Sequence, residues 1–246
     1  MLAVAEPGVI VGVDRFSRDG LPAVADRPTV GDFVTPSLEA ILRLRPTLVV
    51  LDRVQTKVAA GLESAGIDTL VLRMETYSDV ATGLREVGAA LGRPDQAAAA
   101  IATLEAEVAA VRKFADESRG DRPRPTVLLV VDRELGGLAN LVATGPDNYL
   151  DELIELAGGD NVLRDSPVRF PRISAEEIIR QAPDVIIDAV HTEELERATS
   201  DWNVLSTVPA VQSRRVYVLG DTMHSHPSPR LGETLRSIAE RIYDER

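Results

Sequence analysis

The amino-acid sequence predicts an α/β protein with parallel sheets, because two kinds of segment alternate along the chain. Apolar runs rich in β-branched residues are typical of buried parallel strands, and they occupy residues 9–13, 47–51, 69–72, 126–131, 185–188 and 216–219. Segments with helical periodicity fall between these runs, at residues 37–45, 54–65, 78–91, 149–157, 174–181 and 228–243. A regular alternation of strand and helix indicates a layered α/β fold.

One segment, residues 95–118, is longer than any other predicted helix. It is rich in Ala and Glu, contains no Gly or Pro, and is long enough for about six helical turns. The sequences GRP before it and RGDRPRP after it stop helices. We therefore predict two lobes, residues 1–94 and residues 119–246, joined by one long rigid helix. A long surface helix on a single domain is the alternative.

The composition indicates a folded protein that does not bind nucleic acid. Of the 246 residues, 44% are apolar, which is enough for a sizeable core. The 39 acidic and 27 basic side chains give a net charge of -12, which repels nucleic acid and anionic lipid. No apolar run approaches the roughly 20 residues that a membrane-spanning helix needs. The absence of Cys excludes disulfides, thiolate metal sites and cysteine nucleophiles.

Two distant segments of the chain repeat one pattern, PSLEAILRLRPTLVV in the first half and ISAEEIIRQAPDVII in the second. Each has a Ser, a Glu two positions later, and a Pro that leads into a predicted strand. Ser37 and Ser174 stand where helix N-caps belong. Glu39 and Glu176 fall in the first helical turn, where the helix dipole favours a carboxylate. Each lobe is thus predicted to contain the same helix–Pro–strand unit.

This repeated unit, together with ATGPDNYLDELIELAGGDNVL, RFPRISAEEIIRQAPDVII and WNVLSTVPAVQSRRVYVLG, resembles the periplasmic iron-siderophore and cobalamin binding proteins of ABC importers. The match runs through nearly the whole chain in the expected order. The resemblance implies two Rossmann-like lobes, a ligand cleft between them, and a periplasmic or envelope-anchored location. Members of that family carry a strand and a helix ahead of the position of VIVGVD. We therefore expect the first strand of the first lobe, and any export signal, to be missing from this sequence.

Four arginines follow predicted strands, at Arg15, Arg53, Arg73 and Arg133. Ligands of open α/β sheets bind outside the carboxyl ends of the strands. Four guanidinium groups at those ends predict a positive site that binds an anionic ligand through forked hydrogen bonds. Three of the four follow an Asp directly, so local salt bridges are the alternative.

Aromatic residues make up 4% of the chain, and three of them are candidate ligand contacts. The resemblance places Phe33 and Phe170 where macrocycle-binding relatives present aromatic faces. Tyr149 is the third candidate, with a position in the core as the alternative. For Trp202 we predict a core position, because the apolar segment VLSTVPAV follows it.

The chain contains three histidines, His191, His224 and His226, and each is a candidate polar contact to the ligand. Two imidazoles in an H-x-H spacing can approach one ion, so ligation of zinc or iron is an alternative. In the family that the chain resembles, the chelator itself supplies the ligands of the metal. We therefore predict no cofactor and no metal site formed by protein side chains.

These patterns favour capture of a small-molecule metal chelate, a ferric siderophore with anionic groups, and its delivery to an ABC permease. In the resembled family, the residues matching Glu39 and Glu176 dock on arginines of the permease, one per subunit. Cobalamin and haem are alternative ligands of the same fold. A two-lobed enzyme such as a nucleotide-sugar transferase is the alternative of a different class. The chain carries neither G-x-G-x-x-G after a strand nor G-x-x-x-x-G-K-[ST], H-E-x-x-H or G-x-S-x-G, so we predict no enzymatic activity.

Overall fold

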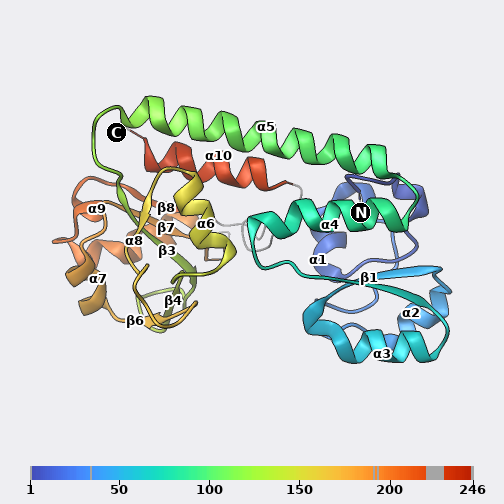
Figure 1. Ribbon diagram of the computed structural model, residues 1–246. Coiled ribbons are helices and arrows are strands. Elements are labelled where there is room, and N and C mark those ends of the chain that lie inside the picture. The colour runs from blue at the N-terminus through green and yellow to red at the C-terminus, as the bar shows by residue number, and fades with distance from the viewer. Residues whose placement is uncertain (1, 34, 191, 193, 220–229, 245–246) are drawn as a thin grey trace. The chain divides into compact units, whose positions relative to one another are not determined.

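The computed structural model describes residues 2–33, 35–190, 192, 194–219 and 230–244 (Figure 1). The chain forms two compact units, Met1–Thr103 and Leu104–Arg246. The division falls inside the long helix α5 (Pro94–Arg119), which confirms the helix predicted at residues 95–118. The assignment of residues 1–94 and 119–246 to separate lobes stays a prediction.

The first unit contains a two-stranded parallel sheet. Strands β1 (Leu48–Asp52) and β2 (Asp68–Leu72) pair along their whole length. Its helices and 3-10 helices are η1 (Pro7–Val9), α1 (Arg15–Gly20), η2 (Pro22–Val24), α2 (Leu38–Leu44), η3 (Arg53–Gln55), α3 (Thr56–Ser64) and α4 (Tyr77–Ala90). A small apolar cluster under the sheet is formed by buried Ile41, Leu51, Ala59 and Leu62.

The prediction of a strand in the apolar run VIVGV, residues 9–13, is wrong. Pro7 begins the 3-10 helix η1, and its carbonyl oxygen accepts a hydrogen bond from the amide of Ile10 at 3.1 Å. Further along, Val13 makes one isolated parallel bridge, to Thr29. Val9 is 49% exposed, so the run lacks the two-sided burial that a central parallel strand has.

The second unit contains a six-stranded sheet of order β6-β4-β3-β7-β8, with β5 also paired to β3. Its strands are β3 (Thr126–Asp132), β4 (Leu141–Ala143), β5 (Asp160–Asn161), β6 (Arg172–Ile173), β7 (Val185–Asp188) and β8 (Val216–Val218). The pairs β3–β7 and β7–β8 are parallel, as predicted, and β3–β5 is parallel as well, whereas β3–β4 and β4–β6 are antiparallel. The sheet is therefore mixed, and the α/β fold class is confirmed.

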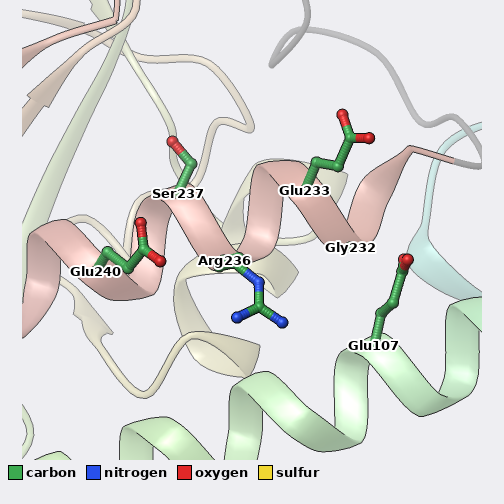
Figure 2. Close-up of a pocket in the computed structure, with 6 residues that line it drawn as sticks. All are labelled: Glu107, Gly232, Glu233, Arg236, Ser237 and Glu240. Atoms are coloured by element: carbon green, nitrogen blue, oxygen red, sulfur yellow. The ribbon is translucent and has the colours of Figure 1, made fainter.

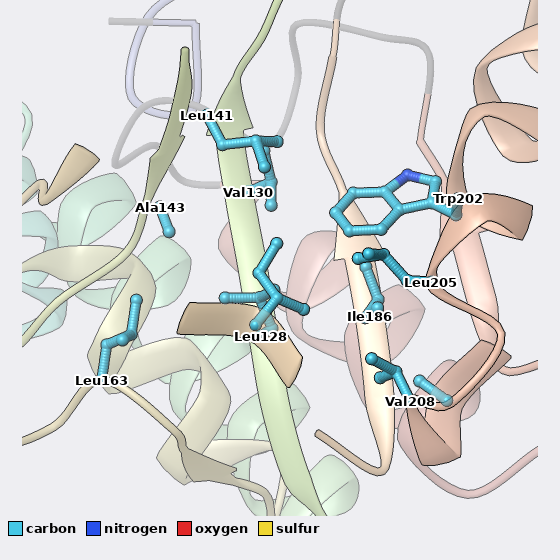
Figure 3. Packing of buried hydrophobic residues seen from close by; sticks show 11 residues of the cluster. Leu128, Val130, Leu141, Ala143, Leu163, Ile186, Trp202, Leu205 and Val208 are labelled. Carbon is cyan, nitrogen blue, oxygen red and sulfur yellow. The ribbon is translucent and has the colours of Figure 1, made fainter. Parts of the chain in front are cut away.

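The helices of the second unit cover this sheet. They are α6 (Tyr149–Leu156), α7 (Ala175–Gln181), α8 (Leu195–Ser200), η4 (Asp201–Leu205), α9 (Pro209–Gln212) and α10 (Leu231–Ile242). In the core, Trp202 and Leu205 pack on one side of Ile186 (Figure 3). Leu128 and Val130 project from β3 on its other side. Trp202 is fully buried, which confirms its predicted core position.

The repeated helix–Pro–strand unit is present in both halves of the chain. The hydroxyl groups of Ser37 and Ser174 accept hydrogen bonds from backbone amides three residues later, at 3.2 and 3.3 Å, so both predicted N-caps are confirmed. Helices α2 and α7 each have seven residues and end at a residue with a left-handed backbone, Arg45 (φ 49°) and Ala182 (φ 47°). The left-handed residue ends each helix directly before a Pro, which disfavours helical geometry in the residue preceding it.

Candidate functional site

Two predicted arginines lie together at the carboxyl ends of β1 and β2, and two carboxylates lie with them. Arg53 forms an ion pair with Glu75 at 2.8 Å, and Arg73 lies 3.3 Å from Glu75 and 3.6 Å from Asp79. The side chains of Arg53 and Arg73 are 53% and 57% exposed, so both can still reach a ligand. Their charge is balanced locally by the two acids, and this end of the first unit is less basic than the sequence predicted.

Asp79 is fixed by the start of helix α4. Its carboxylate accepts hydrogen bonds from the amides of Glu75 and Thr76 at 3.0 and 2.9 Å, and the Thr76 hydroxyl caps the helix in return. Burial raises the pKa of Asp79, but these hydrogen bonds and the charge of Arg73 outweigh it and lower the pKa. Asp79 therefore stays ionised beside the arginines. The pattern T-x-x-D after the predicted strand is the signal that could have located it.

The loop that carries Phe33 is attached to the end of β1 by one side chain. The Nε2 atom of Gln55 donates a hydrogen bond to the Phe33 carbonyl oxygen at 2.6 Å, and its Oε1 accepts one from the Asp52 amide at 3.0 Å. Phe33 itself is half-buried. Val54 follows Arg53 in η3 and is 67% exposed. The backbone of Phe33 and the exposed side chain of Val54 thus lie at the end of β1, the strand that Arg53 follows.

Arg15 lies in a different setting. It is the first residue of α1, it is exposed, and its guanidinium carbon lies 5.6 Å from the centroid of the Phe16 ring. The neighbouring Asp14 caps the same helix by accepting a hydrogen bond from the Ser17 amide at 2.9 Å. The carboxylate of Asp14 therefore has a structural function, and a ligand contact by Arg15 stays a prediction.

Arg133, predicted as a ligand contact, is buried in this structure and bonded on all sides. Its side chain has no exposed surface. Its Nε donates to Asp188 at 2.7 Å and its Nη1 donates to Asp201 at 2.8 Å, while Nη2 donates to the Ala198 carbonyl oxygen at 2.8 Å. The indole Nε1 of Trp202 donates to the same carboxylate oxygen of Asp188 at 2.9 Å. Arg133 therefore connects β3 to β7 and to the α8–η4 segment.

Of the remaining predicted aromatic contacts, one is buried and one is exposed. Tyr149 is 5% exposed, and burial raises the pKa of its phenol. Tyr149 therefore has the core position that was the alternative to its ligand contact. Phe170 is 46% exposed, on the loop that precedes β6. Val168, two residues earlier, is 52% exposed.

His191, His224 and His226 lie outside the described residues, so their contacts with a ligand stay predictions. Within the described part of the chain, no group of three or more His, Cys, Asp or Glu side chains is placed to hold a metal ion. No helix among these residues is long and apolar enough to cross a membrane.

Glu39 and Glu176 are both exposed on the first turns of their helices. The side chain of Glu39 is 86% exposed and forms an ion pair with Arg43 at 2.8 Å. A hydrogen bond with the hydroxyl of Ser174 lowers the pKa of Glu176, so this carboxylate is ionised at neutral pH. The helix caps are made by serines, which leaves both carboxylates able to bind a cationic partner.

A small cavity lies between α5 and α10 in the second unit (Figure 2). It measures about 210 Å³ and is lined by Glu107, Gly232, Glu233, Arg236, Ser237 and Glu240. Pockets for drug-sized ligands measure roughly 300 to 1,000 Å³. The cavity is therefore small for a metal chelate, and its three carboxylates repel an anionic ligand.

Comparison with known sequences identifies the class of protein to which this α/β chain belongs. The profile of the family described as "Periplasmic binding protein" matches residues 1–223, so the chain belongs to this family. It is 28% identical to a protein of Halobacterium salinarum named cobalamin-binding protein, over 99% of this chain and 66% of that protein. It is also 28% identical to the vitamin B12-binding protein of Salmonella typhi, over 85% of this chain and 76% of that protein.

A solved structure shows the same fold. The periplasmic heme-binding protein RhuT from Roseiflexus sp. RS-1, in its apo form, superimposes with a TM-score of 0.84 and 28% identity, covering 99% of this chain and 93% of that one. The relatives named here are binding proteins, which confirms the predicted class. The chain spans 66% of the length of the halobacterial relative.

Proposed function

We propose that the protein is the solute-binding component of an ABC importer and that it binds a metal-containing macrocycle, cobalamin first among them. The observation that carries this proposal is the similarity to cobalamin-binding relatives along 99% of the chain. The charges near the candidate site also favour a ligand with little net charge. A strongly anionic siderophore requires several available arginines, whereas Arg133 is buried and Arg53 and Arg73 are balanced by acids. A corrinoid carries little net charge and gains more from apolar contact.

The location and the partner follow from the same proposal. A binding component of this kind acts outside the cytoplasm and delivers its ligand to a membrane permease. The exposed pair Glu39 and Glu176 is proposed to contact arginines of that permease, one on each of its subunits. The ligand cleft between the two lobes stays a prediction.

Ligand screening tests the proposal directly. Purified protein should be titrated with cyanocobalamin, hemin and a ferric hydroxamate siderophore by isothermal calorimetry, and we expect cyanocobalamin to bind most tightly. Binding of hemin alone would keep the class and change the ligand. Binding of the siderophore alone would restore the ligand predicted from sequence and contradict the proposal. A thermal shift with a nucleotide sugar, and with none of the three probes, would favour the enzyme.

Replacing Arg53 and Arg73 together by Ala should change cyanocobalamin affinity by less than about threefold, because the ligand carries little net charge and gains most of its affinity from apolar contact. Any anionic probe that binds should lose more than about tenfold, since each charge-assisted hydrogen bond contributes roughly 1.5–3 kcal/mol. Arg18→Ala, which removes a partly exposed arginine of the same unit paired with Asp19, is the matched control. A large loss of cyanocobalamin affinity in the double variant would contradict the neutral-site argument.

A further inference from the structure

The loop of residues 166–171 presents two apolar side chains to solvent, Val168 (52% exposed) and Phe170 (46% exposed). Exposed apolar side chains that lie close together mark binding surfaces more often than scattered ones do. If the loop had no fixed conformation, this exposure would need no functional explanation, because the apolar side chains could be buried in other conformations of the loop. The backbone contacts of this loop do not fit that explanation.

The loop is attached to the end of β4 by hydrogen bonds on both sides of Phe170. The amide of Gly145 donates to the Arg169 carbonyl oxygen at 2.8 Å, and the amide of Ala143 donates to the Pro171 carbonyl oxygen at 2.9 Å. The side chain of Asn148 donates from Nδ2 to the same Arg169 oxygen at 3.1 Å. Phe170 is thus exposed on a backbone that is held in place on either side.

Asn148 connects this loop to the body of the second unit. Its Oδ1 accepts hydrogen bonds from the amides of Leu150 and Asp151 at 3.0 and 3.2 Å and so caps helix α6. Its Nδ2 donates to the carbonyl oxygens of Gly145 and Arg169 at 2.9 and 3.1 Å. The residue is only 6% exposed, and leaving a buried donor or acceptor without a partner costs stability.

Gly145 allows the close approach of the loop. A Cβ atom at this position would overlap the carbonyl oxygen of Val168 and lie 3.2 Å from that of Arg169. Any larger residue at position 145 would push the loop outward. The glycine and the asparagine of the sequence TGPDN therefore act together to hold the loop against β4.

The first unit holds its own aromatic loop in a comparable way. The Gln55 carboxamide bonds to the carbonyl oxygen of Phe33 through its nitrogen and to the Asp52 amide through its oxygen. In each unit, then, one carboxamide side chain bonds to the backbone of the segment that carries a candidate ligand-contacting phenylalanine and holds it beside the residues that follow a strand. A carboxamide can do this because it has a donor and an acceptor on one rigid plane.

We propose that Asn148 is a positioning residue for the ligand, and that it holds Val168 and Phe170 as a fixed apolar wall against the ring face of a macrocycle. The proposal rests on the proposed function and extends it by naming the wall and the residue that orients it. A wall fixed before binding does not have to be ordered when the ligand arrives, which strengthens binding.

The test is Asn148→Ser, because serine keeps the cap of α6 and is too short to reach Arg169. We expect the affinity for cyanocobalamin to fall about tenfold. In a Phe170→Ala, Val168→Ala background, the same change should have less than about a twofold effect, because there is no wall left to position. The amide hydrogen of Gly145 should also exchange with solvent faster in Asn148→Ser, and NMR measures this rate. Gly145→Ala, which displaces the loop by overlap, should also weaken binding.

Two controls separate positioning from a general loss of stability. Tyr243→Phe deletes one hydrogen bond to a backbone carbonyl in the same unit, that of Gly158, and Gly137→Ala adds a methyl group where no atom lies within 4 Å. Both should leave affinity unchanged. Equal losses from Asn148→Ser with and without the wall would overturn the proposal, as would an unchanged Gly145 exchange rate. If the wild-type protein binds neither cyanocobalamin nor hemin, the proposed function fails, while the exchange measurement still tests how Asn148 holds the loop.

Discussion

Replacing Arg133 by Ala is expected to lower the free energy of unfolding by about 3–5 kcal/mol, because removing one partner of a buried ion pair leaves the other charge uncompensated. Asp188, which has no exposed surface, would lose its cation and keep only part of its hydrogen bonds. Asp201 and the carbonyl oxygen of Ala198 would lose donors as well. The guanidinium carbon also lies 5.8 Å from the centroid of the Trp202 ring, a contact that the variant removes.

Urea unfolding of the variant and the wild type measures this loss. Arg53→Ala is the matched control, because Arg53 also pairs with a carboxylate but is 53% exposed. Its expected cost is at most about 1 kcal/mol, as for other exposed ion pairs. A loss of less than about 1 kcal/mol for Arg133→Ala would show that Arg133 does not stabilise the fold, and it would reopen a role in ligand binding.

The wild type and the Arg133→Ala variant should also differ in how much stability they lose at acidic pH. Burial raises the pKa of Asp201, but hydrogen bonds from Arg133 and from the Gly136 amide, with the charge of Arg133, outweigh it, so the pKa lies below its ordinary value. A carboxyl with a lowered pKa stabilises the folded state above its unfolded pKa of about 3.9 and loses that effect as the pH falls through its folded pKa. The free energy of unfolding of the wild type should therefore decrease below about pH 4, and Arg133→Ala should show a smaller decrease.

Local patterns predicted most of the elements, because the features that define them are close together in the sequence. Helix α5 follows from its composition and from the Gly and Pro residues at its ends. The units around Ser37 and Ser174 follow from caps within a few residues of the helices they begin. The strands β4, β5 and β6 were not predicted, since segments of two or three residues are too short to show a period.

The candidate site was harder to predict because its decisive contacts join residues far apart. Arg133 follows a strand, which made it a candidate for a ligand contact. Its two carboxylate partners lie 55 and 68 positions away, and no local pattern reveals that pairing. Asn148 was within reach, since Asn directly before a predicted helix indicates an N-cap. Its second bond, to Arg169, lies 21 positions away and needed the structure.

Reversing Glu39 or Glu176 to Lys is expected to abolish delivery of the ligand while leaving its affinity in solution unchanged. Each carboxylate is exposed at the start of one of the two repeated units, and the helix caps themselves are made by Ser37 and Ser174. In the proposed docking each glutamate contacts an arginine of one permease subunit, and like charges brought together would prevent that contact. The reversal replaces an attraction by a repulsion, so a single change should suffice.

Uptake of labelled cyanocobalamin into vesicles that contain the permease measures delivery, and calorimetry measures affinity. Glu196→Lys is the matched control, because Glu196 is also an exposed first-turn glutamate, on α8, but stands outside the repeated unit. It should transport normally. If Glu39→Lys and Glu176→Lys also transport normally and lose only a little thermal stability, the two glutamates serve their helices alone. Restored transport after the matching permease arginine is changed to Glu would show instead that each glutamate binds that arginine, since only a direct contact regains attraction when both charges are exchanged.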